Sequence, residues 1–296
     1  MSMYSECTLC PRKCCVDRSL SHGFCKQSDE IKIARADLHH WEEPCISGTK
    51  GSGTVFFSGC TLKCCFCQNY EISQNNKGYN VSVNELADIF LELQSKGAHN
   101  INLVSPTPHI PKVIEALDLV KDKLIVPVVY NCSGYENVET IKMLNSYVDV
   151  YLPDIKYFSD EYAFKYSACK NYFDTALSAI KEMVLQTGSP TFDDDGQIIS
   201  GVIVRHLVLP SLRHDSIRII EELSKVFKPG EILLSLMSQY VPMHNSFDFK
   251  ELSRRISTFE YNSVLDFACS SGFDGFSQRR ESATDEYIPE FSGERD

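Results

Sequence analysis

The stretch GSGTVFFSGCTLKCCFCQN, Gly51–Asn69, combines two signals that decide the fold. Its first part, Thr54–Ser58, is a short run of β-branched and aromatic residues, which is typical of a buried strand. Its second part places four cysteines within eight positions directly after that run. We therefore expect a strand whose carboxyl end carries a cysteine-rich loop.

The rest of the chain alternates between short apolar runs and segments with helical spacing. The expected strands are Thr54–Ser58, Asn102–Val104, Leu124–Tyr130, Val148–Leu152, Val202–Leu209 and Ile232–Leu236. The expected helices are Val83–Gln94, Pro111–Lys121, Val138–Leu144, Asp160–Leu185, Ser216–Phe227 and Phe249–Phe267. This alternation predicts an α/β protein with a parallel sheet. Six units are too few for a closed eight-stranded barrel, so we expect an open, partial barrel, with a doubly wound sheet as the alternative.

The composition divides the chain into three regions. Residues 1–50 show no α/β repeat and are predicted to form a cysteine-rich N-terminal appendage. Residues 51–270 form the predicted barrel, and residues 271–296 a charged C-terminal tail. No G-x-S-x-G motif, P-loop or G-x-G-x-x-G motif is present.

Charge and hydropathy exclude two classes of partner. The formal net charge of −11 argues against nucleic acid, whose phosphates require clustered Lys and Arg. No apolar run approaches the roughly 20 residues that cross a bilayer, so no membrane association is expected. The polar N-terminus lacks a secretory signal, and we expect a cytoplasmic protein.

Thirteen cysteines are a high number for a chain of 296 residues, and ten of them precede residue 68. In a secreted protein they would suggest disulfide bonds. In a reducing cytosol such clusters more often bind metal, and we favour this interpretation.

Cys60, Cys64 and Cys67 have the spacing C-x3-C-x2-C. Three thiolates on one loop can bind three irons of a [4Fe–4S] cube and leave the fourth iron open for another ligand. A zinc site, or a redox pair of Cys64 and Cys67, is an alternative that the spacing supports less well. Cys65 is not needed for the motif and is expected to be a small, partly buried residue.

Several motifs resemble one known family. The C-x3-C-x2-C loop after the first strand, with an aromatic residue before the last cysteine, resembles the radical SAM superfamily. More narrowly, GSGTVFFSGCTLKCCFCQN, NCSGYE, YLPDIKY and SLMSQYVP resemble a paralogue family of the pyruvate formate-lyase activating enzyme. The similarity extends over nearly the whole chain, but no motif identifies a substrate.

The resemblance implies a partial (β/α)6 TIM-like barrel with a [4Fe–4S] cluster at its mouth. In this superfamily S-adenosylmethionine (SAM) binds the open iron, and one electron from the reduced cluster cleaves it to methionine and a 5′-deoxyadenosyl radical. That radical abstracts hydrogen, here from a protein or peptide substrate such as a glycyl radical enzyme. The implied electron donor is a flavodoxin or a ferredoxin.

Site residues follow from the resemblance position by position. Cys60, Cys64 and Cys67 would be the cluster ligands, and no catalytic residue is expected beyond them. The residues expected to bind SAM are Phe66, Ser105, Asn131, Ser133, Asp154, Lys156, Arg205 and His244. The cationic side chains in this set suit a carboxylate, and the polar ones suit hydroxyl groups.

One segment departs from the family pattern. Activating enzymes usually carry a GGE sequence after the second strand, where the SAM amino group binds, whereas this chain reads VSPTPHI, Val104–Ile110. Backbone carbonyls, or the hydroxyls of Ser105 and Thr107, could accept the same ammonium hydrogens. Two further functions therefore stay open: radical modification of a ribosomal peptide or small molecule, and a non-catalytic iron–sulfur or zinc protein.

A second cysteine group lies in the segment CTLCPRKCCVDRSLSHGFC. Cys7, Cys10, Cys14 and Cys25 could bind a structural zinc or a second iron–sulfur cluster, and spacing does not separate the two. Cys15 is an alternative to Cys14, and Cys45 could join the group or replace a member. Reduced cysteines that only pack the appendage are the competing interpretation.

Overall fold

The computed structural model describes residues 3–277 and Phe291. All six expected strands form, with shifts of a few residues at their ends. The strands are β1 (Ile31–His39), β2 (Ser52–Phe57), β3 (Tyr79–Val81), β4 (Ile101–Val104), β5 (Val128–Cys132), β6 (Val150–Pro153), β7 (Thr191–Phe192), β8 (Ile198–Leu207), β9 (Leu233–Met237) and β10 (Gly275–Ser277).

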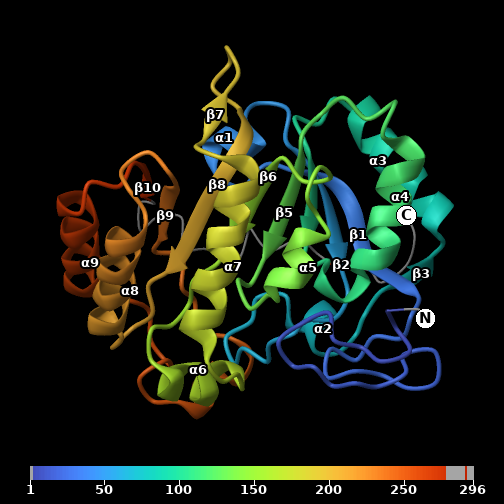
Figure 1. Ribbon diagram of the computed structural model, residues 1–296. Coiled ribbons are helices and arrows are strands. Elements are labelled where there is room, and N and C mark those ends of the chain that lie inside the picture. The colour runs from blue at the N-terminus through green and yellow to red at the C-terminus, as the bar shows by residue number, and fades with distance from the viewer. Residues whose placement is uncertain (1–2, 278–290, 292–296) are drawn as a thin grey trace.

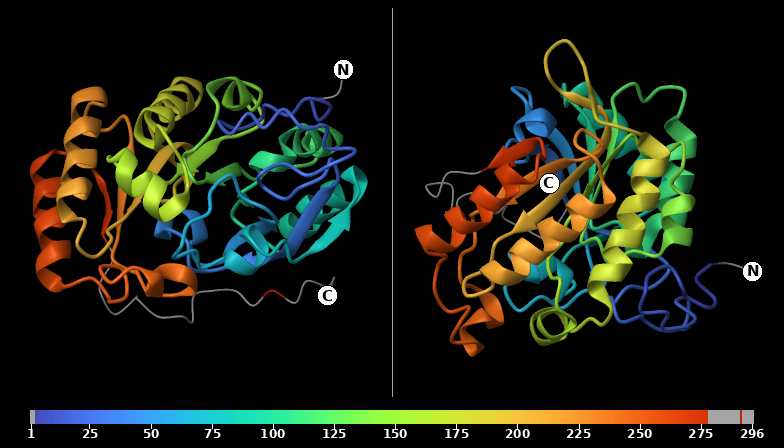
Figure 2. Two further views of the ribbon diagram at one scale, coloured as in Figure 1. Left: turned by 90° about the horizontal axis from the view of Figure 1, so that it is seen from below. Right: turned by 60° about the vertical axis from the view of Figure 1, so that its left-hand side comes forward.

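The strands form one mixed sheet with the order β10-β9-β8-β6-β5-β4-β2-β1-β3, and β7 pairs with β8 as a side hairpin. From β2 to β10 all neighbours on this path are parallel, whereas β1 runs antiparallel to both β2 and β3. The sheet curves into an open arc (Figure 2). The parallel strands end at one edge, which is the lower edge in Figure 1. This architecture confirms the expected partial barrel.

The longer helices α3 (Val83–Ser95), α4 (Ile110–Val120), α7 (Tyr172–Thr187), α8 (Arg213–Val226) and α9 (Thr258–Ser270), together with α5 (Val138–Lys142), cover the outer side of the arc (Figure 2). The short helices α1 (Pro44–Ser47), α2 (Tyr70–Ser73) and α6 (Asp160–Ser167) and the 3-10 turns η1 (Thr107–His109) and η2 (His244–Asp248) lie in the connections. Local sequence explains where α3 begins, because Ser82 and Glu85 form the capping box that the sequence predicts. Among the helices of residues 3–277, none is both long and apolar enough to span a bilayer.

Two expected helices were wrong in extent. The segment expected as Asp160–Leu185 is broken into α6 and α7, because Ala168 and Asn171 both adopt the left-handed conformation with φ 51°. The segment expected as Phe249–Phe267 becomes helical only from Thr258. There Ser257 caps the helix together with Glu260.

The sheet extends beyond the expected barrel limits at both ends. Residues 31–39, expected within an appendage, form β1, and β10 adds residues 275–277 of the expected tail. The strand β1 was not predicted from the sequence, because only the first half of the strand has buried positions. Phe291 packs edge-on against Phe56 of β2, with 5.4 Å between the ring centroids. The other residues of the expected tail beyond 277 lie outside the described residues.

Candidate active site

The cysteine loop after β2 is held in place by segments from distant parts of the chain. Gly59 begins it with φ +83°, and a Cβ at this position would come within 2.5 Å of the Gln27 side chain. Only glycine allows this conformation and this close packing of the N-terminal segment. Further along, the amide of Cys65 donates to the carbonyl of Tyr166 at 2.8 Å. The loop is therefore fixed from two sides.

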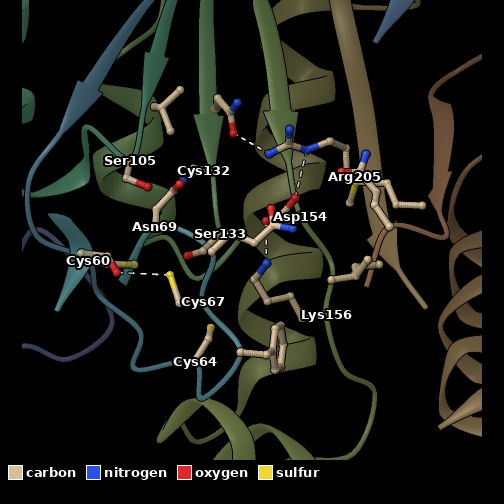
Figure 3. A pocket seen from close by; sticks show the side chains of 18 of the residues that line it. Cys60, Cys64, Cys67, Asn69, Ser105, Cys132, Ser133, Asp154, Lys156 and Arg205 are labelled. Atoms are coloured by element: carbon tan, nitrogen blue, oxygen red, sulfur yellow. Dashed lines mark hydrogen bonds and ion pairs between the residues drawn. The ribbon is translucent and has the colours of Figure 1, made fainter. Parts of the chain in front are cut away.

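Cys60, Cys64 and Cys67 line one cavity of about 260 Å³, which we call the main cavity (Figure 3). The Ser167 hydroxyl donates to the Cys64 sulfur at 3.0 Å, and the Cys67 sulfur lies 3.2 Å from the Ser73 hydroxyl. Cys65, in contrast, is buried in the hydrophobic core and is absent from this lining. Three of the four cysteines in the loop thus face one space.

The three thiols suit a cluster. Burial raises the pKa of Cys60 to about 12 and that of Cys67 to about 11, so both are neutral unless a metal stabilises the thiolates. Within the described part of the chain, no three His, Cys, Asp or Glu side chains are arranged to hold one metal ion. A [4Fe–4S] cube distributes its ligands over separate irons, so its cysteines need not converge on one point.

Most of the residues expected to bind SAM also line the main cavity. They are Phe66, Ser105, Asn131, Ser133, Asp154, Lys156 and Arg205. Phe66 packs edge-on against Tyr240, at 5.8 Å between ring centroids. His244 is the exception: it is not part of the lining, and its ring stacks on Tyr70 at 4.6 Å.

Two adjacent strand ends bring several of these side chains together. Gly134 follows β5 with φ +75°, and a Cβ there would overlap the carbonyl oxygen of Asp154 after β6. Asp154 also forms a parallel bridge with Arg205 of β8, where the amide of Ile155 donates to the Arg205 carbonyl at 2.8 Å. The NCSGYE and YLPDIKY motifs therefore meet at one edge of the sheet because their strands are parallel neighbours.

A network of charges crosses the cavity wall (Figure 3). Lys156 Nζ lies 2.6 Å from Asp154 Oδ2, and Arg205 Nε lies 2.9 Å from Asp154 Oδ1. Arg205 also donates through Nη1 to Glu42 at 3.1 Å and through Nη2 to Asn131 Oδ1 at 2.5 Å. These contacts use three of the five N–H donors of Arg205 and one of the three of Lys156.

The charges in this network stabilise one another. Burial alone would raise the pKa of Asp154, but the Arg205 guanidinium and the Lys156 ammonium hold it below its usual value. Burial alone would lower the pKa of Lys156, yet the Asp154 carboxylate raises it. Both groups therefore stay ionised at neutral pH.

Four further lining residues were not predicted as site residues from the sequence: His39, Trp41, Glu42 and Glu43. They enter the cavity because β1 runs antiparallel to β2 and delivers the following loop to the amino ends of the parallel strands. Burial raises the pKa of Glu42 and of Glu43, against the effect of Arg205. The acidic pair in front of Pro44 was the only local signal that could have drawn attention to them.

Thr107 does not take the place expected from the sequence. Its hydroxyl donates to Glu136 at 2.8 Å and lies 3.2 Å from the Tyr130 hydroxyl, and it is absent from the main cavity lining. Burial raises the pKa of Glu136 to about 8, so this carboxyl is largely protonated at neutral pH. Of the two hydroxyls expected to replace GGE, only that of Ser105 belongs to the cavity.

The four N-terminal cysteines line a second space of about 10 Å³, which we call the N-terminal cavity. Its cysteines are Cys7, Cys10, Cys14 and Cys25. The sulfurs of Cys14 and Cys25 both lie beside Gly23, at 3.2 Å and 3.4 Å from the position that a Cβ would take there. Arg18 is fully buried next to them, with Nη1 3.9 Å from the Cys7 sulfur. The four thiols share a space large enough for about one small ion or one water.

The two alternative members of this group are placed elsewhere. Cys15 is exposed, with its sulfur 3.3 Å from the carbonyl of Lys13. Cys45 lies in α1 and packs with Val129 and Val150 in a different hydrophobic cluster. Neither lines the N-terminal cavity, so the expected roles for these two cysteines were wrong.

Comparison with known proteins agrees with this geometry. The radical SAM superfamily model matches residues 54–196. An uncharacterised protein of Methanocaldococcus jannaschii is 31% identical over 277 residues, which cover 90% of this chain and 75% of that protein. A radical SAM methyltransferase from Sphaerobacter thermophilus has a similar fold, with a TM-score of 0.55 and 14% identity over 82% of this chain and 71% of that chain.

SuiB of Streptococcus suis, solved with bound S-adenosylmethionine, also has a related fold, with a TM-score of 0.50 and 12% identity over 79% of this chain and 51% of its own. Members of the matching superfamily use a [4Fe–4S] cluster and SAM. The family model begins in β2 and includes the cysteine loop, NCSGYE and YLPDIKY. The chain therefore belongs to the radical SAM superfamily.

Proposed function

We propose that this enzyme abstracts a hydrogen atom from a protein or peptide substrate, in the manner of a glycyl-radical-enzyme activase. The observation that carries the proposal is that Cys60, Cys64 and Cys67 share one cavity with Lys156 and Arg205. Cysteine ligands are thus adjacent to cations that suit the carboxylate of SAM. When bound, the cluster and SAM together supply the one-electron chemistry that generates a carbon radical.

The chain's own residues would hold and orient the reactants. Lys156 keeps two free N–H donors after its contact with Asp154, and these can bind a carboxylate. Asn131 and Ser133 offer polar contacts to a ribose, and Phe66 offers an aromatic edge or face to an adenine. The buried wall around them limits the access of water to a reactive radical.

Formation of 5′-deoxyadenosine tests the proposed reaction type. The full-length protein, reconstituted anaerobically with iron and sulfide, should release 5′-deoxyadenosine and methionine when dithionite and SAM are added. An intact cluster that gives neither product would overturn the proposal.

Radical modification of a ribosomal peptide or a small molecule is the second candidate. The segment Ser105–Pro106–Thr107 supports it, because the Thr107 hydroxyl is bonded to Glu136, so that only the Ser105 hydroxyl and backbone carbonyls remain in place of GGE. Electron paramagnetic resonance separates the candidates: a glycyl radical on a co-expressed glycyl radical enzyme supports the first, and its absence with active SAM cleavage supports the second.

A further inference from the structure

The main cavity also has an acidic part that the sequence did not predict. Cys60 follows the carboxyl end of β2, whereas Glu42 and Glu43 follow β1 and enter the cavity from the amino end of β2. Their side chains adjoin the charge network, because Glu42 contacts both Arg205 and Asn131. We call the part of the cavity formed by Glu42 and Glu43 the acidic end.

Glu42 is fully engaged by neighbouring donors. It accepts from Arg205 at 3.1 Å, from Asn102 Nδ2 at 3.1 Å and from Asn131 Nδ2 at 3.3 Å. The side chain is also only 10% exposed. Glu42 therefore has a structural partner for each oxygen and needs no ligand.

Glu43 differs from its neighbour. It is 7% exposed and lines the cavity, and the Ser235 hydroxyl bonds to its carboxylate. Its Oε2 atom, however, is buried without a hydrogen-bond partner among the described residues, and so is Oδ1 of nearby Asn102. A buried acceptor without a donor is unfavourable, and native proteins rarely leave one unless a ligand, ion or water completes it.

The charges of the lining point to the type of ligand that would complete Glu43. Three lining carboxylates, Glu42, Glu43 and Asp154, face two lining cations, Lys156 and Arg205. Both cations are paired with Asp154, and Arg205 is also paired with Glu42. Among the described residues, Glu43 has no ion pair within 4 Å, although the charge of Arg205 acts on it as well as on Glu42, and a cationic group could complete its Oε2 atom.

We propose that Glu43 binds a cationic nitrogen, an ammonium or a guanidinium, of the substrate. The inference rests on the proposed function, since it assigns the acidic end to the molecule from which hydrogen is taken. Trp41 is 58% exposed and lines the same cavity with His39 and Phe56, so aromatic rings are available to pack along the stem of such a group. A lysine or arginine side chain of a peptide has this chemistry.

Trp41 also provides the measurement, because it is the only tryptophan of the chain. Its fluorescence would be titrated in the full-length protein with n-butylammonium and, as a neutral probe of similar size, n-butanol. We expect a saturable change with n-butylammonium only. In Glu43→Gln the dissociation constant should rise at least tenfold, whereas in Glu115→Gln, at an exposed position of α4, it should stay within twofold.

Three results would overturn the inference: equal binding of n-butanol, unchanged affinity in Glu43→Gln, or displacement of n-butylammonium by SAM. The last result would show that the SAM ammonium, rather than the substrate, occupies Glu43. If Glu43→Gln does not fold, as judged by circular dichroism, Glu43→Asp serves instead and should bind n-butylammonium but not n-butanol. The titration needs no cluster, so failure of 5′-deoxyadenosine formation would contradict the proposed function without affecting this result.

Discussion

The two cysteine groups of this molecule have mirrored spacings but different surroundings. Cys60, Cys64 and Cys67 follow the pattern C-x3-C-x2-C, and the N-terminal group begins C-x2-C-x3-C at Cys7. The first group borders a cavity of about 260 Å³ with cations in its wall, and the second encloses about 10 Å³. Spacing thus indicates metal binding in both, but only the space around the first leaves room for a substrate.

The largest effect is expected from Cys64→Ala. Loss of one of three ligands should prevent stable cluster binding, because the one other cysteine that lines the main cavity among the described residues is Cys132, the last residue of β5. We expect iron content and 5′-deoxyadenosine formation to fall more than 100-fold. Retained activity would show that the loop cysteines are not the ligands, and the comparison between the two groups would fail.

Asp154→Ala tests how much the charge network of the main cavity contributes to the free energy of unfolding. Asp154 and both of its partners are less than 20% exposed, and removing it leaves Lys156 without its partner. We expect a loss of about 3–5 kcal/mol in the free energy of unfolding, measured with urea. Glu139→Ala, which removes an exposed pair with Lys142, should cause no measurable change.

Because the pKa of Asp154 is lowered in the folded state, its contribution has a defined pH dependence. It is fully present above the ordinary pKa of an aspartate and is lost as the pH falls through the lower, folded-state value. An acid titration should therefore destabilise the wild type and converge with the Asp154→Ala variant. If the free energies of unfolding of the two proteins instead changed in parallel with pH, ionised Asp154 would not be the stabilising group.

Glu136 lies between the two sites, since its partner Thr107 lines the N-terminal cavity. Its folded pKa of about 8 exceeds the usual value near 4.5, so the folded state retains a proton that the unfolded chain releases. Stability should fall by about 1.4 kcal/mol per pH unit between these two values. Glu136→Gln should remove this slope in unfolding experiments at pH 5–8, and an unchanged slope would assign it to other groups.

The N-terminal group is expected to matter for metal content more than for chemistry. The four thiols are not arranged around one point in this structure, but their shared cavity has room for one ion. We therefore predict that a metal draws them together, with about one zinc bound per chain and lost in Cys10→Ser, measured by mass spectrometry. Formation of 5′-deoxyadenosine should change less than threefold. Equal metal content in both proteins would show that these thiols only pack the segment.

The smallest effect is expected from Cys65→Ala. Its thiol is buried in the core, while the bond to Tyr166 uses the backbone amide and is retained. We expect a loss of about 1 kcal/mol or less and unchanged iron content. Loss of the cluster in this variant would indicate that Cys65 is a ligand. Cys60, Cys64 and Cys67 would then no longer be set apart from Cys65.

The sequence predicted those parts of the site that lie at the ends of parallel strands. Asn131, Asp154 and Arg205 were assigned from the family resemblance, and they meet because their strands are neighbouring parallel strands of the sheet. Glu42 was not predicted as a site residue. It is 163 residues from Arg205 in the sequence and follows the antiparallel strand β1, whose direction no local sequence pattern indicates.

His244 was predicted to bind SAM but does not line the main cavity, for a related reason. It follows β9 and begins the 3-10 turn η2, where it adopts φ 52° and stacks on Tyr70. Strand ends can be predicted from hydrophobic patterns, whereas the path of a long loop depends on contacts formed only in the folded protein.

The attachment of the N-terminal segment has a consequence for the synthesis of the chain. Arg12 donates to the carbonyls of Thr61 and Ala168, 49 and 156 residues later, and Thr140 donates to the carbonyl of Leu9. At about 5–20 residues per second, a ribosome needs roughly 10–30 s to extend the chain from Arg12 to Ala168. During this time the N-terminal cysteines have left the ribosome, but their segment cannot yet pack against the rest of the protein. Their thiols are therefore exposed to the surrounding redox buffer before they are buried.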